Sequence, residues 1–209
     1  MTRPDIANAV RSTARRAHDA NREDWKTVLN ILGYLHGTKD LGLGLTGTGG
    51  QLVAYADSNY ATTRKDRKSV SGGAIMYGDS CIAWFSRTQR CVSTSSAEAE
   101  HISLAECSKE AMFVYHVLEF LEPGKRVPPV VLREDNEGAI CLAQNPLSSG
   151  RTKHIDVRHH YIRDLVKRGR VQVEHVSSER QHADTLTKPL SVGSFKRHRN
   201  FLLNSRRVS

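Results

Sequence analysis

Residues 95–100 have the sequence Ser95-Ser96-Ala97-Glu98-Ala99-Glu100, which fits the capping box that begins many helices. The predicted helix runs to about Leu121, because Glu122-Pro123-Gly124 stops it. Extending its apolar stripe backward by four residues leads to Glu100, whereas Glu98 lies about 200° away from Glu100 around the helix. Glu100, rather than Glu98, is therefore expected to face the neighbouring sheet. The stripe itself consists of Leu104, Cys107, Ala111, Val114, Leu118 and Leu121.

Short apolar runs on both sides of this helix predict strands. Three runs precede the helix and are joined by loop and turn residues, so we expect antiparallel pairing among them. Two runs follow it, and strand–helix–strand crossovers of this kind add parallel strands to a sheet. The sequence therefore predicts an α/β fold, a five-stranded mixed sheet flanked by helices. The predicted strands are Leu52 to Asp57, Gly72 to Tyr77, Cys81 to Phe85, Val130 to Asp135 and Val171 to Val176.

The chain is expected to divide into three parts. Residues 1–45 form a small helical segment, and a glycine-rich stretch from 42 to 50, with a weak strand at its start, marks its end. Residues 51–190 form the α/β domain, and residues 191–209 form a basic C-terminal helix and tail. An amphipathic stripe in the first part consists of Trp25, Val28, Leu29, Leu32 and Leu35. Other helices are predicted at Glu137 to Gln144, Lys153 to Arg168, Ala183 to Thr187 and Ser194 to Leu203.

The composition indicates a basic protein without membrane spans. Apolar residues make up 38% and charged residues 25% of the chain, which is ordinary for a globular domain. The formal net charge of +9 favours polyanionic partners, above all nucleic acid. The chain has no run of about 18 apolar residues and no apolar stretch of a signal peptide. The four cysteines lack metal-site and disulfide-framework spacing, so we expect buried, reduced thiols.

Four acidic residues are candidates for a metal site. Asp57 and Asp135 close predicted strands, while Glu100 and Asp184 lie near the starts of predicted helices. Brought together at one sheet edge, these carboxylates would repel one another unless cations neutralised them. Oxygen ligands without cysteine or paired histidine select Mg²⁺ or Mn²⁺ over zinc, and two such ions can promote phosphodiester cleavage. Taken singly, each acid could instead be a helix cap, a turn cap or a solvated surface group.

An ordered set of motifs resembles the ribonuclease H domain of copia-type LTR retrotransposon polyproteins. In that family the fold is the ribonuclease H fold, and the activity is Mg²⁺-dependent cleavage of RNA within an RNA–DNA hybrid. The resemblance implies that Asp57, Glu100, Asp135 and Asp184 are the catalytic residues and hold two Mg²⁺ or Mn²⁺ ions. Family members often carry Asp-x-Asp-Trp at the first motif, where this chain has Asn59 and Tyr60. The motifs are Tyr55 to Tyr60, Asp66 to Gly72, Ser93 to Glu100, Glu134 to Asn136, Arg151 to Arg158 and His182 to Pro189.

The first part of the chain, residues 3–38, resembles the end of the reverse transcriptase region that precedes this domain, but it lacks an aspartate-pair polymerase motif. The implied partners are an RNA–DNA hybrid and the upstream reverse transcriptase region, without a membrane or a small-molecule ligand. The implied location is the cytoplasm, in virus-like particles, with access to the nucleus. Candidates for contact with nucleic acid are Arg64, Lys65, Arg67, Lys68, Asn136, Arg151 and Lys153.

Two other functions remain open at this stage. A non-catalytic relic would bind hybrids with a steep salt dependence but would not cleave them. A strand-transfer enzyme on the same fold would also use clustered acids, although the long capped helix that carries Glu100 favours ribonuclease H. His182, two residues before Asp184, could assist proton transfer or product release, but its interpretation as a loop histidine without function is favoured.

Overall fold

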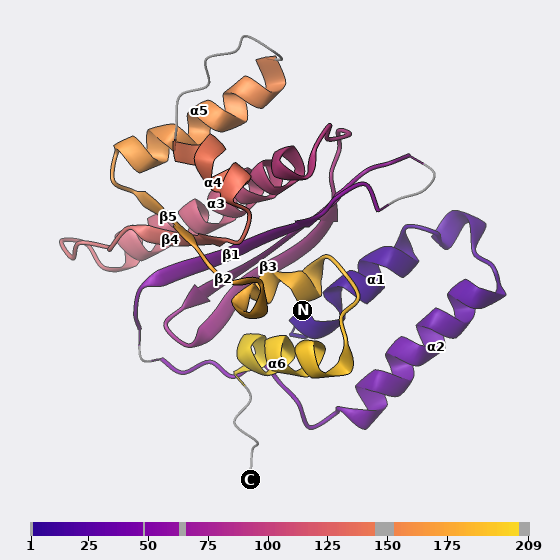
Figure 1. Cartoon of the computed structure of the whole chain (residues 1–209). Helices are drawn as coiled ribbons and strands as arrows, with labels where there is room; N and C mark the ends of the chain where they lie inside the picture. Colours follow the sequence, from indigo (N-terminus) through magenta and orange to yellow (C-terminus); the bar gives the residue numbers. More distant parts are fainter. Residues whose placement is uncertain (1, 48, 63–65, 145–152, 205–209) are drawn as a thin grey trace.

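The computed structural model describes residues 2–47, 49–62, 66–144 and 153–204, with the backbone alone described at 153–159. Its centre is a five-stranded sheet with the order β3-β2-β1-β4-β5 (Figure 1). The β1, β2 and β3 strands pair antiparallel, whereas β4 and β5 run parallel to β1. The predicted five-stranded mixed sheet is therefore confirmed. The strands are β1 (Leu52–Asn59), β2 (Val70–Tyr77), β3 (Ser80–Thr88), β4 (Val130–Glu134) and β5 (Val171–His175).

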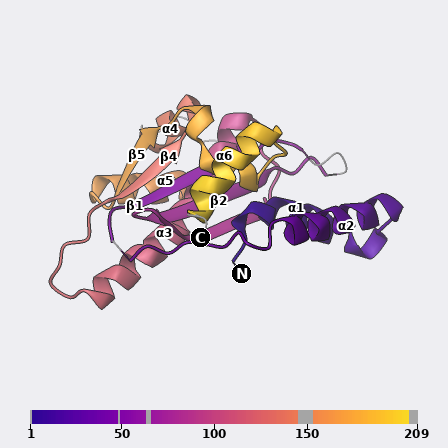
Figure 2. The ribbon, with the colours of Figure 1, turned by 90° about the horizontal axis from the view of Figure 1, so that it is seen from below.

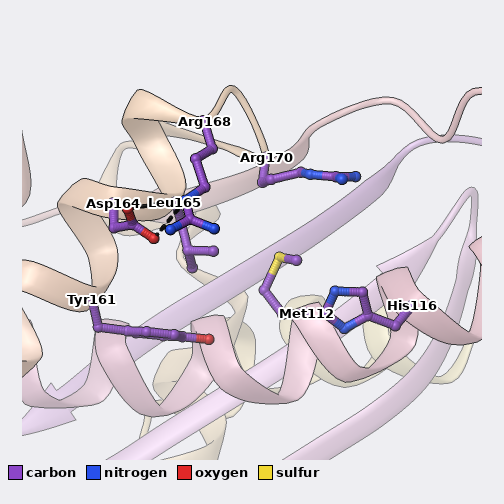
Figure 3. A pocket seen from close by; sticks show the side chains of 7 residues that line it. All are labelled: Met112, His116, Tyr161, Asp164, Leu165, Arg168 and Arg170. Atoms are coloured by element: carbon purple, nitrogen blue, oxygen red, sulfur yellow. Dashed lines mark hydrogen bonds and ion pairs between the residues drawn. The ribbon is translucent and has the colours of Figure 1, made fainter.

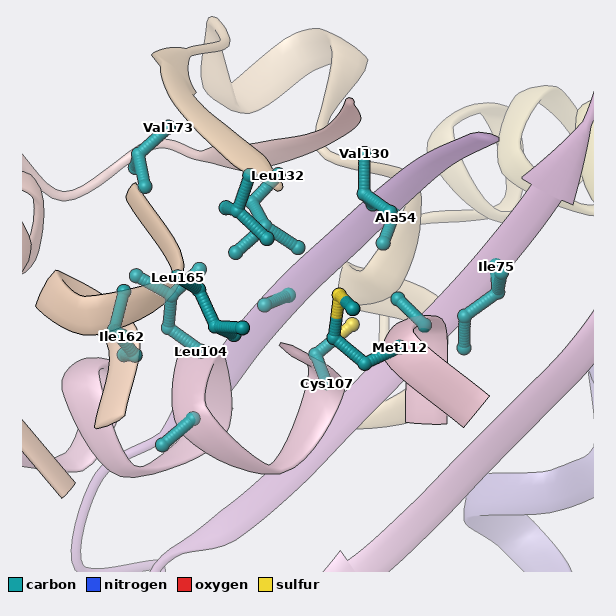
Figure 4. Packing of buried hydrophobic residues seen from close by; sticks show 14 of the residues in the cluster. Ala54, Ile75, Leu104, Cys107, Met112, Val130, Leu132, Ile162, Leu165 and Val173 are labelled. Carbon is teal, nitrogen blue, oxygen red and sulfur yellow. The ribbon is translucent and has the colours of Figure 1, made fainter. Parts of the chain in front are cut away.

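One face of the sheet packs against the crossover helices. Ala54 of β1 and Leu132 of β4 point toward the long helix, where Leu104 and Cys107 are fully buried against them (Figure 4). Strand side chains alternate between the two faces, so the even-numbered residues of β1 and β4 form this core. The helices that join β3 to β4 and β4 to β5 are α3 (Ser96–Leu121), α4 (Glu137–Gln144) and α5 (Lys153–Lys167).

The opposite face of the sheet packs against the two ends of the chain (Figure 2). A second apolar cluster joins β2 to Leu186 and Leu202, and Val53 and Tyr55 of β1 contact it. The odd-numbered residues of β1 therefore face the C-terminal elements. These elements and their N-terminal neighbours are η1 (Pro4–Ile6), α1 (Ala7–Ala14), η3 (Ser178–Arg180), η4 (His182–Leu186) and α6 (Val192–Leu203).

The N-terminal segment forms a helical hairpin beside the sheet (Figure 1). After η2 (Ala17–Asp19), a capping box between Asn21 and Asp24 begins α2 (Arg22–Gly37). Arg16 of the preceding turn forms an ion pair of 2.5 Å with Asp24, which ties the start of α2 to the end of α1. The chain therefore turns between α1 and α2, and Asn21 begins the second helix.

The apolar stripe predicted on α2 is only partly covered. Trp25, Leu29 and Leu32 are 61%, 48% and 55% exposed, although their spacing is that of a buried helix face. Val28 and Leu35 are half-buried. The stripe therefore leaves an apolar face on the outside of the hairpin.

Two local predictions differ from the structure. The weak strand expected near Gly42 is absent from residues 41–47 and 49–51, and Gly44 instead donates a backbone hydrogen bond of 2.6 Å to Leu203. The buried stripe of α3 does not reach Leu121, which is 64% exposed, because the end of the helix extends beyond the core; Met112 and Tyr115 are buried instead.

In the described part of the chain, no helix combines the length and the apolar character needed to cross a membrane.

Candidate active site

The register of the two central parallel strands places Asp57 level with Asp135. Tyr55 of β1 pairs with Arg133 of β4, and continuing this register by two residues aligns the two aspartates. Neighbouring strands are about 4.8 Å apart, and residues two apart on a strand share a face. Asp57 and Asp135 therefore lie side by side at the carboxyl edge of the sheet.

Asp57 is the centre of the acidic cluster. Its side chain is buried, with 1% exposure, and accepts a hydrogen bond from the hydroxyl of Thr187. Burial and the negative charge of Asp184 raise the pKa of Asp57 to about 7, although Lys188 and Thr187 act in the opposite direction. Asp135 adds a smaller upward shift of the pKa. The site therefore concentrates negative charge on a carboxyl group that has little contact with water.

Asp184 reaches the cluster because η4 is fastened to the sheet. The side chain of Gln181 donates a hydrogen bond of 2.8 Å to the carbonyl of Ala56 and accepts one from the backbone N–H of Ala183. A Cβ atom on Gly72 of β2 would lie 2.6 Å from Thr187 Cγ2, so glycine allows η4 to approach the strand closely. The carboxylate of Asp184 forms an ion pair of 2.9 Å with Lys188, one helical turn further along the chain.

Glu100 belongs to the cluster, whereas Glu98 caps the helix. Ser95 accepts a hydrogen bond from the backbone N–H of Glu98, and the carboxylate of Glu98 accepts one of 2.7 Å from the backbone of Thr94. Glu100 is 8% exposed, and burial raises its pKa to about 10, with further upward shifts from Asp57, Glu134 and Asp135. The distinction drawn from the helical stripe therefore agrees with the geometry.

A fifth carboxyl group, Glu134, was not among the predicted site residues. It is completely buried on β4, and burial raises its pKa well above the usual value. One oxygen accepts a hydrogen bond of 3.1 Å from the backbone of Asn136, while the other oxygen has no hydrogen-bond partner. Because side chains alternate along a strand, Glu134 points to the face of the sheet that α3 covers, where it interacts with Glu100. Asp57 and Asp135 point to the opposite face. The available signal in the sequence was its spacing, because Glu134 lies two residues after Leu132 and so shares the face of that buried side chain.

Hydrogen bonds of Asp135 and Asn136 connect the end of β4 to η3 and α4. Asp135 is half-buried and accepts a hydrogen bond of 2.8 Å from the hydroxyl of Ser178 in η3. The side-chain oxygen of Asn136 accepts one of 3.0 Å from the backbone of Ala139 and so caps α4. The capping role considered for Asp135 therefore falls to Asn136, whose part in binding nucleic acid stays a prediction.

The donor set suits a hard divalent cation in its chemistry. All the acids of the cluster offer oxygen atoms, and one oxygen each of Glu100 and Glu134 has no hydrogen-bond partner despite being buried. In the described residues, however, no three acidic, histidine or cysteine side chains have the spacing needed to ligate one ion. The ammonium group of Lys188, 2.9 Å from Asp184 and 3.5 Å from Asp57, balances part of the charge.

The candidate residues for nucleic acid binding are only partly described. Arg67 is exposed and Lys68 is half-buried in the loop between β1 and β2, where Asp66 forms an ion pair of 2.6 Å with Arg15. Arg64, Lys65 and Arg151 lie outside the described residues, as does the side chain of Lys153. Their contact with nucleic acid therefore stays a prediction.

His182 has a structural environment. Its ring stacks on Phe201 at 3.5 Å, and its Nδ1 atom lies 3.1 Å from Nδ1 of His198. Burial lowers the pKa of His182 to about 3, and the nearby charges of His198 and Arg197 add to this shift. A neutral His182 therefore joins α6 to η4.

The structure also contains a pocket of about 310 Å³ away from the acids (Figure 3). It lies between α3 and α5, and an ion pair between Asp164 and Arg168 spans one side. Met112 in its wall is twelve residues along α3 from Glu100, about 18 Å at the rise of an α-helix. The pocket is therefore separate from the candidate active site. Its lining residues are Met112, His116, Tyr161, Asp164, Leu165, Arg168 and Arg170.

The chain resembles known proteins along nearly its whole length. It is 39% identical over 197 residues to the "Retrovirus-related Pol polyprotein from transposon RE2" of Arabidopsis thaliana, covering 94% of this chain and 14% of that protein. It is 36% identical over 195 residues to the corresponding polyprotein from transposon TNT 1-94 of Nicotiana tabacum, covering 93% and 14%. This chain thus spans about one seventh of the length of these relatives.

In its fold, the chain is similar to solved structures of ribonucleases H. The crystal structure of RNase H1 from Halobacterium salinarum is 18% identical, with a TM-score of 0.48, over 66% of this chain and 95% of that one. No family model matches the chain. Over more than nine tenths of its length, the chain is therefore similar to one segment of retrovirus-related Pol polyproteins from copia-type transposons.

Proposed function

We propose that this protein hydrolyses the RNA strand of RNA–DNA hybrids during reverse transcription of a copia-type retrotransposon, with Mg²⁺ or Mn²⁺ as cofactor. The observation that carries the proposal is the meeting of Asp57, Glu100, Asp135 and Asp184 at one edge of the sheet. Asp57 interacts electrostatically with each of the other three carboxyl groups. Such a concentration of buried acids costs folding free energy, which is characteristic of functional sites.

Each of the four acids is carried by a different secondary-structure element, and these elements define their proposed roles. Asp57 comes from a central strand and is oriented by the hydroxyl of Thr187, so it is the fixed point of the site. Asp135 and Glu100 approach it from β4 and α3, and Asp184 approaches it from η4. Bound divalent cations would supply electrostatic stabilisation of phosphate oxygens and would make water more acidic. The protein would bind and orient these cations through carboxylates anchored on separate elements.

Charge outside the acidic cluster supports a nucleic acid substrate. The net charge of +9 attracts a phosphate backbone that the acidic cluster alone would repel. Arg67 and Lys68, in the loop after β1, are proposed to contact this backbone near the site. The 2′-hydroxyl group distinguishes the RNA strand from DNA at the position of cleavage.

The exposed apolar face of α2 is proposed to contact the second partner, the upstream reverse transcriptase region. Trp25, Leu29 and Leu32 form an apolar row on the hairpin that resembles the end of a reverse transcriptase region. We propose that the upstream region of the polyprotein packs against this row. Cytoplasmic virus-like particles, with access to the nucleus, are the corresponding proposed location.

The decisive experiment measures cleavage of a labelled RNA–DNA hybrid by the wild type and by Asp57→Asn. We expect the wild type to cleave in Mg²⁺ and not in EDTA, and we expect the variant to lose at least about a thousandfold in rate. Circular dichroism and salt-dependent hybrid binding should remain close to the wild type. Binding without cleavage by the wild type would identify a non-catalytic relic. Strand transfer on duplex DNA would identify the other alternative, and equal cleavage by the variant would exclude the assigned site.

A further inference from the structure

We propose that Lys188 is an internal counter-ion that occupies the acidic cluster in the metal-free protein and leaves it when a divalent cation binds. Lys188 would thus be a positioning residue that sets the threshold of metal concentration for activity. This inference rests on the proposed metal-dependent function. Its subject, however, is the metal-free protein, which the cleavage assay does not examine.

The first observation is the place of the ammonium group. The Lys188 Nζ atom lies 2.9 Å from an oxygen of Asp184 and 3.5 Å from an oxygen of Asp57. One cation therefore bridges two carboxylates that come from different elements. Asp57 and Asp184 would also hold a divalent cation in the proposed function, so the ammonium group and the cation would compete for these carboxylates.

The second observation is the spacing of the carboxylates. Oxygen ligands lie about 2.1 Å from Mg²⁺, whereas an ammonium nitrogen requires about 2.8 Å to each oxygen. In the described part of the chain, no three acidic, histidine or cysteine side chains are close enough to share one ion. The distances of 3.5 and 2.9 Å from Lys188 Nζ to the oxygen atoms of Asp57 and Asp184 are thus those of a lysine salt bridge and longer than metal–oxygen distances.

The third observation is that Lys188 can leave without disturbing its neighbours. Its side chain is 35% exposed, so the ammonium has a path to solvent along a flexible stem. Its backbone N–H remains bonded to the carbonyl of Asp184, and the adjacent Thr187 keeps its own hydrogen bond to Asp57. The backbone can therefore stay in place while the charged end of Lys188 moves.

A matched set of variants of the full 209-residue chain tests the proposal. Mn²⁺ binding is measured by calorimetry for the wild type, Lys188→Gln, Lys188→Arg and Arg180→Gln. If the lysine occupies the site for nine tenths of the time, Lys188→Gln should bind Mn²⁺ about tenfold more tightly than the wild type. Lys188→Arg, which retains a cation, should bind no more tightly than the wild type. Arg180 is exposed on η3, so Arg180→Gln removes a nearby positive charge and should change the affinity by less than about twofold.

Thermal unfolding supplies a second readout that is independent of cleavage. In EDTA, Lys188→Gln should unfold roughly 2–4 °C below the wild type, because the carboxylates lose their counter-ion. At saturating Mn²⁺ this difference should disappear, because the ammonium has already left the site. Unchanged or weaker Mn²⁺ binding by Lys188→Gln would overturn the inference, and so would an equal gain for Arg180→Gln. Absence of Mn²⁺ binding in every variant would overturn both the inference and the proposed cofactor.

Discussion

Thr187 and Asp57 are 130 residues apart in the chain, and a hydrogen bond from the threonine hydroxyl to the aspartate carboxylate joins them. This bond connects the segment after η4 to the end of β1. The same short segment carries Asp184 and Lys188. The geometry of the acidic cluster therefore depends on how firmly the C-terminal elements are attached to the sheet.

Replacing Thr187 with valine should uncouple these two parts. Valine has nearly the same shape but donates no hydrogen bond, so we expect a loss of about 1 kcal/mol in the free energy of unfolding. The cleavage rate should fall more than hybrid binding does, because Asp57 loses its fixed orientation. Urea denaturation and single-turnover cleavage check both effects. Thr187→Ser keeps the hydroxyl and should preserve activity; an equal loss with serine would mean that the methyl group is what counts.

Glu100 and Glu98 provide a matched pair on one helix. Glu100→Gln should weaken Mn²⁺ binding and abolish cleavage, because a buried oxygen of the acidic cluster loses its charge. Glu98→Gln should leave Mn²⁺ binding unchanged and lower the stability by about 0.5–1 kcal/mol through a weaker helix cap. Calorimetry and urea denaturation separate the two effects. Loss of metal binding in Glu98→Gln would contradict the assignment.

Glu134 should make the metal-free protein less stable at high pH. Its pKa is raised in the folded state, so its contribution to stability is complete below the unfolded value near 4.5 and is lost as the pH rises toward the folded value. The glutamine variant cannot lose a proton. The stability of the wild type relative to Glu134→Gln should therefore fall as the pH rises above about 4.5 in EDTA, by at most about 1.4 kcal/mol per pH unit. A difference that stays constant over this range would show that Glu134 does not titrate.

His182 should have the opposite effect at low pH. Its folded pKa of about 3 is below the unfolded value near 6.5, so its contribution is complete above pH 6.5 and is lost as the pH falls toward 3. His182→Phe keeps an aromatic ring against Phe201 but cannot bind a proton. The stability of the wild type relative to this variant should decrease from pH 7.5 to pH 5, as measured by urea denaturation. An increase over the same range would refute the buried neutral histidine.

Gly72 should tolerate no larger side chain. A Cβ atom there would lie 2.6 Å from Thr187 and 2.9 Å from Leu186, so Gly72→Ala must push η4 away from β2. We expect a loss of about 1–3 kcal/mol in stability and weaker Mn²⁺ binding, because Asp184 moves with η4. Gly193→Ala is the control, since a Cβ atom at that helical position meets nothing within 4 Å. Equal behaviour of the two variants would show that η4 adjusts freely.

The sequence predicted the central elements well because their signals are local. Ser95 and Glu98 mark the start of α3, Pro123 marks its end, and alternating or apolar runs mark the strands. The spacing of the helical stripe also distinguished Glu100 from Glu98. These features depend on residues within one or two turns of each other, which is the range over which sequence patterns are informative.

The parts that were missed depend on contacts between distant residues. Lys188 lies within the motif at residues 182–189, but its ion pair with Asp57 forms only when η4 packs beside β1. Glu134 has the polar character of a surface residue, yet the sheet and α3 bury it completely. Leu121 continues the apolar spacing of α3 past the end of the core, where spacing alone cannot reveal exposure. Burial is decided by tertiary packing, so local patterns cannot supply it.

The attachment of η4 by Gln181 has a consequence for damaged copies of the gene. All five strands are complete by His175, whereas Asp184, Thr187 and Lys188 follow in the next 13 residues. A premature stop codon just after β5 would keep every strand but remove the fourth acid together with Leu186 and Leu202, which cover one face of the sheet. Such a product would lose the acidic cluster and part of its core at once, so we expect truncation there to cost stability as well as the proposed activity.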